Sequence, residues 1–149
     1  MTFKTLLRGI STNILQDNKK PLNAMLRYFD FEEFDSPDVI GSGLPGGEGG
    51  YMSLDFLHAL DEARHIAGVP FKITSGYRSP RHNQLIGGRP GSSHLKGVAV
   101  DIACDNSATR AQILNGLYAA GLGRRIGIGK TFIHVDMDID KPSAIWLYK

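Results

Sequence analysis

The 149-residue sequence contains only one cysteine, Cys104. A single cysteine excludes an internal disulfide, and it excludes every zinc motif that is built from several cysteines. Any bound metal ion must therefore be held by histidine and carboxylate side chains. The chain has five histidines and fifteen acidic residues, so the residue types for such a site are present.

The sequence also lacks a strong charge of either sign. Seventeen Lys and Arg residues against fifteen Asp and Glu residues give a formal net charge of +2, and the basic residues form no dense cluster. Surfaces that follow a nucleic-acid backbone are normally densely basic, so we expect no nucleic-acid partner. The small positive excess would suit an anionic polymer such as a bacterial cell wall, but it is too small to identify one.

No segment is long and apolar enough to span a membrane. Residues 1–20 are amphipathic and predict a short helix that ends before Pro21. They contain neither the uninterrupted apolar core nor the small-residue cleavage site of a secretory signal. We therefore expect the protein to be cytoplasmic on synthesis.

The composition, with 42% hydrophobic and 21% charged residues, suits a globular protein with one core. We expect a single domain over residues 1–149, acting as a monomer. It would consist of an N-terminal extension with a glycine-rich loop over 1–50 and a core over 51–149. The loop over 36–50 is long enough to line or cover a functional site.

The pattern predicts two helices in the core. The first follows Ser53 as its N-cap and stops at Gly68. The second is capped by Ser107 and stops at Gly121. Its expected apolar stripe consists of Ile113, Leu114, Leu117 and Tyr118.

Strands are predicted at 27–34, 71–75, 97–103, 125–129, 131–137 and 144–148, with a second long loop over 76–96. The strand at 97–103 is apolar on both faces and is therefore expected in the middle of the sheet. The elements show no regular strand–helix–strand repeat. This favours an α+β fold: a small, mostly antiparallel sheet with helices packed on it.

Asp101 lies within an otherwise apolar strand, where an unpaired carboxylate would be costly to bury. His134 and Asp136 lie two apart in a later strand, so both point to the same face. His94, His134 and Asp101 together offer two imidazoles and a carboxylate for three corners of a zinc tetrahedron, leaving the fourth for water. A zinc ion there would compensate Asp101 and lower the pKa of the bound water to roughly 7.

Each histidine alone has a plainer interpretation as a surface or core residue. His58 and His65 lie on the first predicted helix and are expected to face solvent, because the leucines of that helix already supply its buried face. His82 lies in the 76–96 loop, where it either supports the site or faces water.

The stretches "ITSGYRSPRHNQLIGGRPGSSHLKGVAVDIA" and "RRIGIGKTFIHVDMD", with a closing Trp-x-Tyr, resemble the M15 zinc peptidases. These include D-alanyl-D-alanine carboxypeptidases and related peptidoglycan endopeptidases. The signature Ser-x-His-x6-Asp with a later His matches Ser92, His94, Asp101 and His134. The resemblance implies one Zn²⁺ held by the last three residues, and an α+β fold shared with hedgehog signalling domains.

The resemblance also implies that Arg78, in the motif "SGYR", binds substrate and stabilises the developing oxyanion. A guanidinium suits this role because it stays charged and donates two hydrogen bonds. Its plainer interpretation is a surface turn residue. Ser75 and Tyr77 of the same motif, together with Ser92, are candidate substrate-binding residues, although Ser75 and Tyr77 would also suit packing roles.

The sequence departs from the family at the general base. Many members carry an acidic residue shortly before the last zinc ligand, but residues 130–133 here are Lys-Thr-Phe-Ile. Asp136 is the best substitute as base, with Asp138 and Glu48 as further candidates. Asp136 has a second interpretation, as a partner that orients a ligand histidine.

The leading hypothesis is a zinc peptidase that cuts peptidoglycan stem peptides, either as a D-Ala-D-Ala carboxypeptidase or as an L-Ala-D-Glu type endopeptidase. Such an enzyme would suit phage or prophage lysis, acting on the wall after release or as part of a virion. Two alternatives remain: a hedgehog-like module that binds zinc and wall peptide without cutting, and a phage structural protein that retains the fold.

Overall fold

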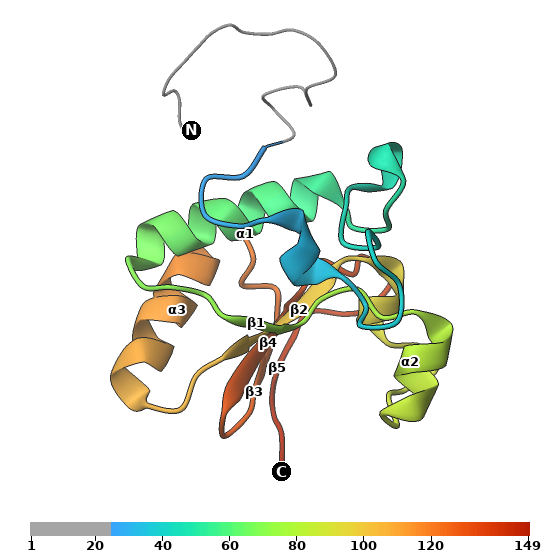
Figure 1. The fold of residues 1–149 in the computed structure, drawn as a ribbon. Coiled ribbons are helices and arrows are strands. Elements are labelled where there is room, and N and C mark those ends of the chain that lie inside the picture. Colours follow the sequence, from blue (N-terminus) through green and yellow to red (C-terminus); the bar gives the residue numbers. More distant parts are fainter. Residues whose placement is uncertain (1–24) are drawn as a thin grey trace, which may run out of the picture.

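The computed structural model describes residues 25–149, so the predicted helix over 1–20 lies outside the described residues. Three α-helices pack with one five-stranded sheet (Figure 1). The helices are α1 (Leu54–Ala67), α2 (Pro80–Leu85) and α3 (Ser107–Ala119). The strands are β1 (Ile73–Ser75), β2 (Ala99–Ala103), β3 (Arg125–Ile128), β4 (Phe132–Asp136) and β5 (Ala144–Leu147). The α+β prediction is confirmed.

The sheet has the strand order β1-β2-β4-β3-β5. Three of its pairings are antiparallel and only β3 and β5 run parallel, so the sheet is mixed but mostly antiparallel, as predicted. Strand β2 lies inside the sheet, between β1 and β4. The five predicted core strands therefore all exist, with ends that differ by one or two residues.

The two faces of the sheet differ in chemistry. One face packs against α1 and α3 and supplies the core, which includes Val100, Ile102, Ile126, Ile133 and Val135 together with helix residues such as Leu57, Leu60, Ile113 and Leu117. The opposite face carries Asp101, His134 and Asp136. The prediction that the 97–103 strand is apolar on both faces is thus wrong at Asp101.

The first predicted helix is confirmed at both ends. The Ser53 side chain accepts a hydrogen bond from the Phe56 N–H (3.2 Å), and Gly68 closes the helix with a positive φ of 72°. In α3 the cap is Asn106, whose side chain accepts from Thr109 N–H (2.8 Å), so the predicted cap Ser107 is the first helical residue instead.

The expected apolar stripe of α3 is only partly right. Ile113 and Leu117 are fully buried, but Tyr118 is 55% exposed. Beside these residues, α3 approaches α1 closely at Gly116, where an added Cβ would meet Ala63 and Ala67 of α1. A glycine carries no apolar side chain, so a stripe of large residues could not reveal it.

Two other predictions need correction. The predicted strand at 27–34 is wrong: Phe31–Phe34 forms the 3₁₀ helix η2, because Asp30 and Glu33 form a capping box that satisfies the backbone locally. The predicted loop over 76–96 contains helix α2 and the 3₁₀ helix η4 (Ser93–Lys96). The loop over 36–50 is confirmed apart from the short 3₁₀ helix η3 (Gly46–Glu48).

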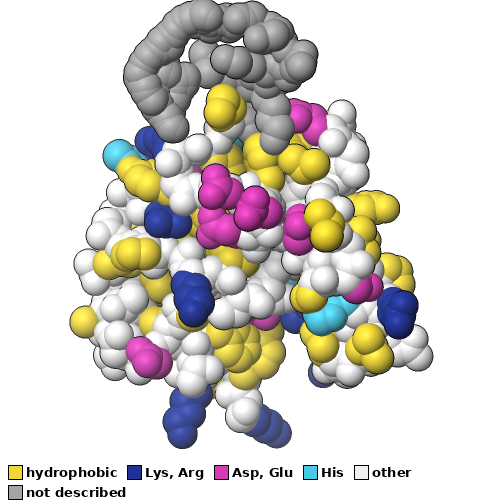
Figure 2. Space-filling view, viewed as in Figure 1, with side chains coloured by type: hydrophobic (Ala, Val, Ile, Leu, Met, Phe, Trp, Pro, Cys, Tyr) yellow, Lys and Arg dark blue, Asp and Glu magenta, His cyan; other side chains and the backbone are white. Residues whose placement is uncertain are grey.

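On the face drawn in Figure 2, acidic side chains gather over the middle while Lys and Arg stand apart from one another. The described residues on this face therefore offer no continuous basic surface to a nucleic-acid backbone. Within residues 25–149, no helix has the length and apolarity to cross a membrane.

We expect Gly116→Ala to destabilise the protein, although alanine normally favours a helix interior. A Cβ at position 116 would lie 2.3 Å from the Ala63 carbonyl oxygen, so the two helices would have to separate. The expected loss is about 1–3 kcal/mol of unfolding free energy, measured by denaturant unfolding. Asn115→Ala, at an exposed neighbouring position, is the control and should stay within about 0.5 kcal/mol. A stabilised Gly116→Ala would show that the close helix contact is wrong.

Candidate metal centre and active site

One row of paired residues crosses the sheet from edge to edge on the face away from α1 and α3. Its members are Ser75, Asp101, His134, Gly127 and Trp146, one from each strand. Paired positions on neighbouring strands project to the same side, so the pairing alone brings Asp101 beside His134. Gly127 has no side chain, which allows the Trp146 ring to pack directly over it: a Cβ there would lie 2.6 Å from that ring.

His94 reaches this row from η4, which lies outside the sheet. The Ser92 side chain caps η4 by accepting from the His94 N–H (3.2 Å), and Gly97 ends it with a positive φ of 71°. The His94 ring is held by its Nδ1 atom, which lies 2.8 Å from the Gly76 carbonyl oxygen. Since a carbonyl can only accept, Nδ1 carries the proton and Nε2 keeps its lone pair in the neutral ring.

His134 is held from its far side in a similar way. Its Nε2 lies 2.7 Å from Asp136 Oδ2, while its Nδ1 lies 3.0 Å from Asp101 Oδ1. The Nε2 atom of His94 lies 3.3 Å from the same Asp101 oxygen. Each imidazole is thus fixed by one nitrogen and turns the other toward Asp101.

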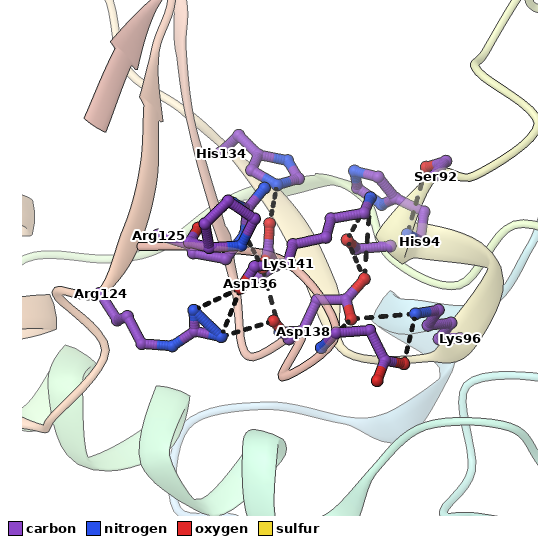
Figure 3. A network of polar contacts seen from close by, with 12 residues as sticks. Ser92, His94, Lys96, Arg124, Arg125, His134, Asp136, Asp138 and Lys141 are labelled. Atoms are coloured by element: carbon purple, nitrogen blue, oxygen red, sulfur yellow. Dashed lines mark hydrogen bonds and ion pairs between the residues drawn. The ribbon is translucent and has the colours of Figure 1, made fainter. Parts of the chain in front are cut away.

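This convergence fits a metal ion. One ligand atom from each of His94, Asp101 and His134 lies within 4.8 Å of the others, the only such His, Cys, Asp or Glu group among residues 25–149. His94 Nε2 is buried and has no hydrogen-bond partner in the described part of the chain, which is costly unless an ion occupies the position. Two imidazoles and one carboxylate form a donor set that zinc commonly takes. Figure 3 shows the two imidazole rings as neighbours that come from different elements, and they meet edge-on with centroids 5.2 Å apart.

The charges of the group are strongly coupled. Burial would raise the pKa of Asp101, but the hydrogen bond from His134 and the proximity of both imidazoles outweigh it and hold the pKa well below its usual range. Burial would lower the pKa of His134, but hydrogen bonds to Asp101 and Asp136 outweigh it and raise the pKa. Both ring nitrogens of His134 thus face carboxylate oxygens, an arrangement that favours the protonated ring when no metal is bound.

Asp136 lies behind His134 rather than beside His94. Its side chain is fully buried, and both oxygens are engaged. Oδ2 faces His134 Nε2, while Oδ1 accepts from Arg125 Nε (2.8 Å) and from the Asp138 backbone N–H (3.0 Å). Of the two roles expected for Asp136, these contacts favour the orienting one.

Asp138 and Glu48, the other candidate bases, do not belong to the group formed by His94, Asp101 and His134. Asp138 is buried and accepts from Ser93 Oγ (2.7 Å) and Lys96 Nζ (2.9 Å), which hold its pKa low, at about 2, against the opposing effect of burial. Glu48 is half-buried in η3.

Arg78 lies at the edge of the metal group. Its Nη2 atom is 3.5 Å from Asp101 Oδ2, and its Nε and Nη1 donate to Ser75 Oγ (3.0 Å) and Asn83 Oδ1 (3.2 Å). Burial lowers the pKa of Arg78, opposed by the charge of Asp101. The guanidinium remains charged, since arginine titrates far above neutral pH.

The candidate substrate-binding residues occupy three different settings. Ser75 supports Arg78, and Ser92 caps the turn that presents His94. Tyr77 is buried and stacks on Tyr51 with ring centroids 4.6 Å apart. Each of these three side chains therefore makes a contact within the protein that accounts for the residue without a substrate.

The remaining histidines lie outside the metal group. His65 is exposed as expected, with Nδ1 2.6 Å from the Tyr28 hydroxyl, whereas His58 is half-buried rather than solvent-facing. His82 lies in α2 and is half-buried.

Three residues around the site were not anticipated: Asn83, Arg125 and Gly76. Asn83 could have been found, because Ser79 followed by Pro80 is a helix-start signal that would have placed it in α2. Gly76 contributes only its carbonyl oxygen, and Arg125 acts through contacts made 11 residues away. Neither leaves a local signal in the sequence.

A buried group of two histidines and one aspartate, on the open face of an α+β sheet, is the kind of centre that metallopeptidases use. The chain belongs to the Peptidase M15 family, whose model matches residues 46–136, more than half of the chain. The matched region contains all three members of the metal group. No curated protein matches the sequence. The chain is therefore a peptidase of a zinc-using family.

The raised pKa of His134 predicts how the stability of the metal-free protein depends on pH. A group whose pKa is raised on folding stabilises the protein fully below its unfolded pKa, here 6.5, and this contribution is lost as pH rises through the folded value. Unfolding free energy of metal-free protein should thus fall as pH increases from about 6 upward. Asp101→Asn removes one carboxylate partner and should flatten this dependence. Equal slopes in both proteins would contradict the coupling.

Proposed function

We propose that this protein is a zinc-dependent peptidase that hydrolyses amide bonds in peptidoglycan stem peptides. The observation that carries the proposal is the convergence of His94 Nε2, His134 Nδ1 and Asp101 Oδ1 in a member of the Peptidase M15 family. When bound there, zinc supplies a Lewis acid and a water whose pKa is lowered to about 7.

The residues of the chain have distinct parts in this proposal. His94 and His134 are each oriented by the nitrogen that faces away from the ion, so little reorganisation is needed for binding. Arg78 is held by Ser75 and Asn83 with Nη2 beside the group. From there it can donate to the carbonyl oxygen on which negative charge develops, or to a terminal carboxylate of the substrate.

We assign Asp136 to positioning His134 rather than to accepting the proton of the attacking water. A general base must lie within hydrogen-bond reach of the proton it removes. Asp136 is enclosed and uses both oxygens on His134, Arg125 and the backbone of Asp138.

The proposed substrate class rests on the family resemblance; the net charge of +2 is compatible with an anionic wall but does not identify one. Both a D-Ala-D-Ala carboxypeptidase and an L-Ala-D-Glu type endopeptidase agree with the site. We place the enzyme in phage or prophage lysis, reaching the wall after release or as part of a virion.

One observation favours a second candidate, a zinc-binding module that holds wall peptide without cutting it. Residues 130–133 carry no acid before His134, and Asp136 is engaged elsewhere. A module of this kind would keep the metal group and Arg78 but would lack a proton acceptor.

Purified protein should bind one Zn²⁺ per chain, and chelation should lower the melting temperature because the ion binds only the folded state. His94→Ala and His134→Ala should lose the metal in elemental analysis. His58→Ala is the matched control, since His58 lies on α1 outside the group, and should keep it. Full zinc occupancy in either ligand variant would mean that the ligands are wrongly assigned.

Incubating the zinc-loaded protein with peptidoglycan should release new amino groups, and mass spectrometry of the digested muropeptides should identify the bond. Loss of a terminal D-alanine indicates the carboxypeptidase, and a new stem-peptide amino terminus at D-glutamate indicates the endopeptidase. His94→Ala serves as the inactive control. Binding to peptidoglycan without new amino groups would support the binding module instead.

A further inference from the structure

Arg125 is a buried arginine that no part of the proposed chemistry uses directly. It begins β3 and is 9% exposed. Its Nε donates to Asp136 Oδ1 (2.8 Å), its Nη1 donates to the Pro142 carbonyl oxygen (2.6 Å), and its Cζ lies 5.0 Å from the centroid of the Trp146 ring. Burying a guanidinium is costly, so these contacts call for a role.

Arg125 contacts both neighbours of the His134 ring. Asp136 holds the Nε2 edge of that ring at 2.7 Å, and Trp146 packs against it with centroids 5.5 Å apart. Because Arg125 and the Asp138 N–H together fix Asp136 Oδ1, the other oxygen is left to face His134 Nε2 (Figure 3). The direction of His134 Nδ1 is thus set through this series of contacts.

We infer that Arg125 is a positioning residue of the metal centre: it fixes Asp136 and Trp146, and through them turns His134 Nδ1 toward His94 and Asp101. The inference rests on the proposed zinc site. It goes beyond that site because it makes zinc affinity depend on a residue that contacts none of the three metal ligands directly.

The geometry requires an arginine rather than a positive charge alone. The planar guanidinium donates in two directions, to a carboxylate and to a backbone carbonyl, while its face lies against an indole ring. An ammonium group on a flexible chain cannot make these three contacts together.

A role of Arg125 through its charge and a role through the orientation of His134 predict opposite changes in zinc affinity when Arg125 is replaced. The two roles can therefore be distinguished by experiment. A buried positive charge near the centre repels Zn²⁺, so removing it would tighten zinc binding if Arg125 acted by charge alone. Loss of orientation weakens zinc binding, and changes in such outer partners typically cost 10- to 100-fold in affinity.

The test measures zinc dissociation constants of the full chain by competition with a chromophoric chelator. Arg125→Gln and Asp136→Asn should each weaken binding about 10-fold or more. The double variant should lose little beyond the larger single effect, because both changes break the same series of contacts. Arg125→Lys keeps the charge but should still bind zinc several-fold more weakly.

Arg124→Gln is the matched control. Arg124 donates to the carbonyl oxygens of Asp138 and Lys141, so it anchors the same turn as Arg125 but does not contact Asp136. Its zinc affinity should remain within about twofold of the wild type. The visible spectrum of the Co²⁺-loaded protein should change in the Arg125 variants and not in Arg124→Gln, since it reports the ligand geometry itself.

Unchanged or tighter zinc binding in Arg125→Lys, or effects of Arg125→Gln and Asp136→Asn that simply add, would overturn the inference. Melting curves of the metal-free variants identify loss of fold, and the decision then rests on Arg125→Lys, which retains the buried charge. A wild-type chain that binds no zinc would instead refute the proposed function, so the two failures are distinguishable.

Discussion

The pairing of β2 with β4 is the constraint on which the rest of the site depends. It sets Asp101 opposite His134 and Ile102 opposite Ile133, so one register fixes both the metal group and the core beneath it. A shift of β4 by one residue would turn His134 into the apolar core and Ile133 outward, and a shift of β2 would do the same to Asp101 and Ile102. Because burial of the isoleucines strongly disfavours such a shift, the hydrophobic core also maintains the geometry of the polar face.

Charges alternate outward from that pair. Asp101, His134, Asp136 and Arg125 follow one another through contacts of 3.0, 2.7 and 2.8 Å, and the carboxylates alternate with groups that carry or can take a positive charge. Buried ion pairs often contribute little net stability, because desolvation offsets their attraction. Their value here is directional: each member limits the orientation of the next. A zinc ion would add its positive charge at the end of this series, next to the Asp101 carboxylate, which lies in an otherwise apolar strand.

The sequence predicts those features that local pattern determines. Ser53 and Gly68 bound α1 because capping is local, and β2, β3 and β4 follow from alternating or continuous apolar runs. The metal group could be proposed because Asp101 and His134 lie in apolar strands and because, with Ser92 and His94, they match the signature of the M15 peptidases. The segment at 27–34 was missed because its capping box outweighs its strand-like alternation. Arg125, Gly116 and Gly76 were missed because their significance depends on a neighbour distant in the chain.

The most direct measurement of the central claim is a diffraction experiment on zinc-loaded crystals at the zinc absorption edge. The account predicts one anomalous difference peak per chain, bounded by His94 Nε2, the Asp101 carboxylate and His134 Nδ1, with Asp136 on the opposite edge of the His134 ring. A peak bound through His134 Nε2, or one placed away from the row that joins β2 and β4, would contradict it.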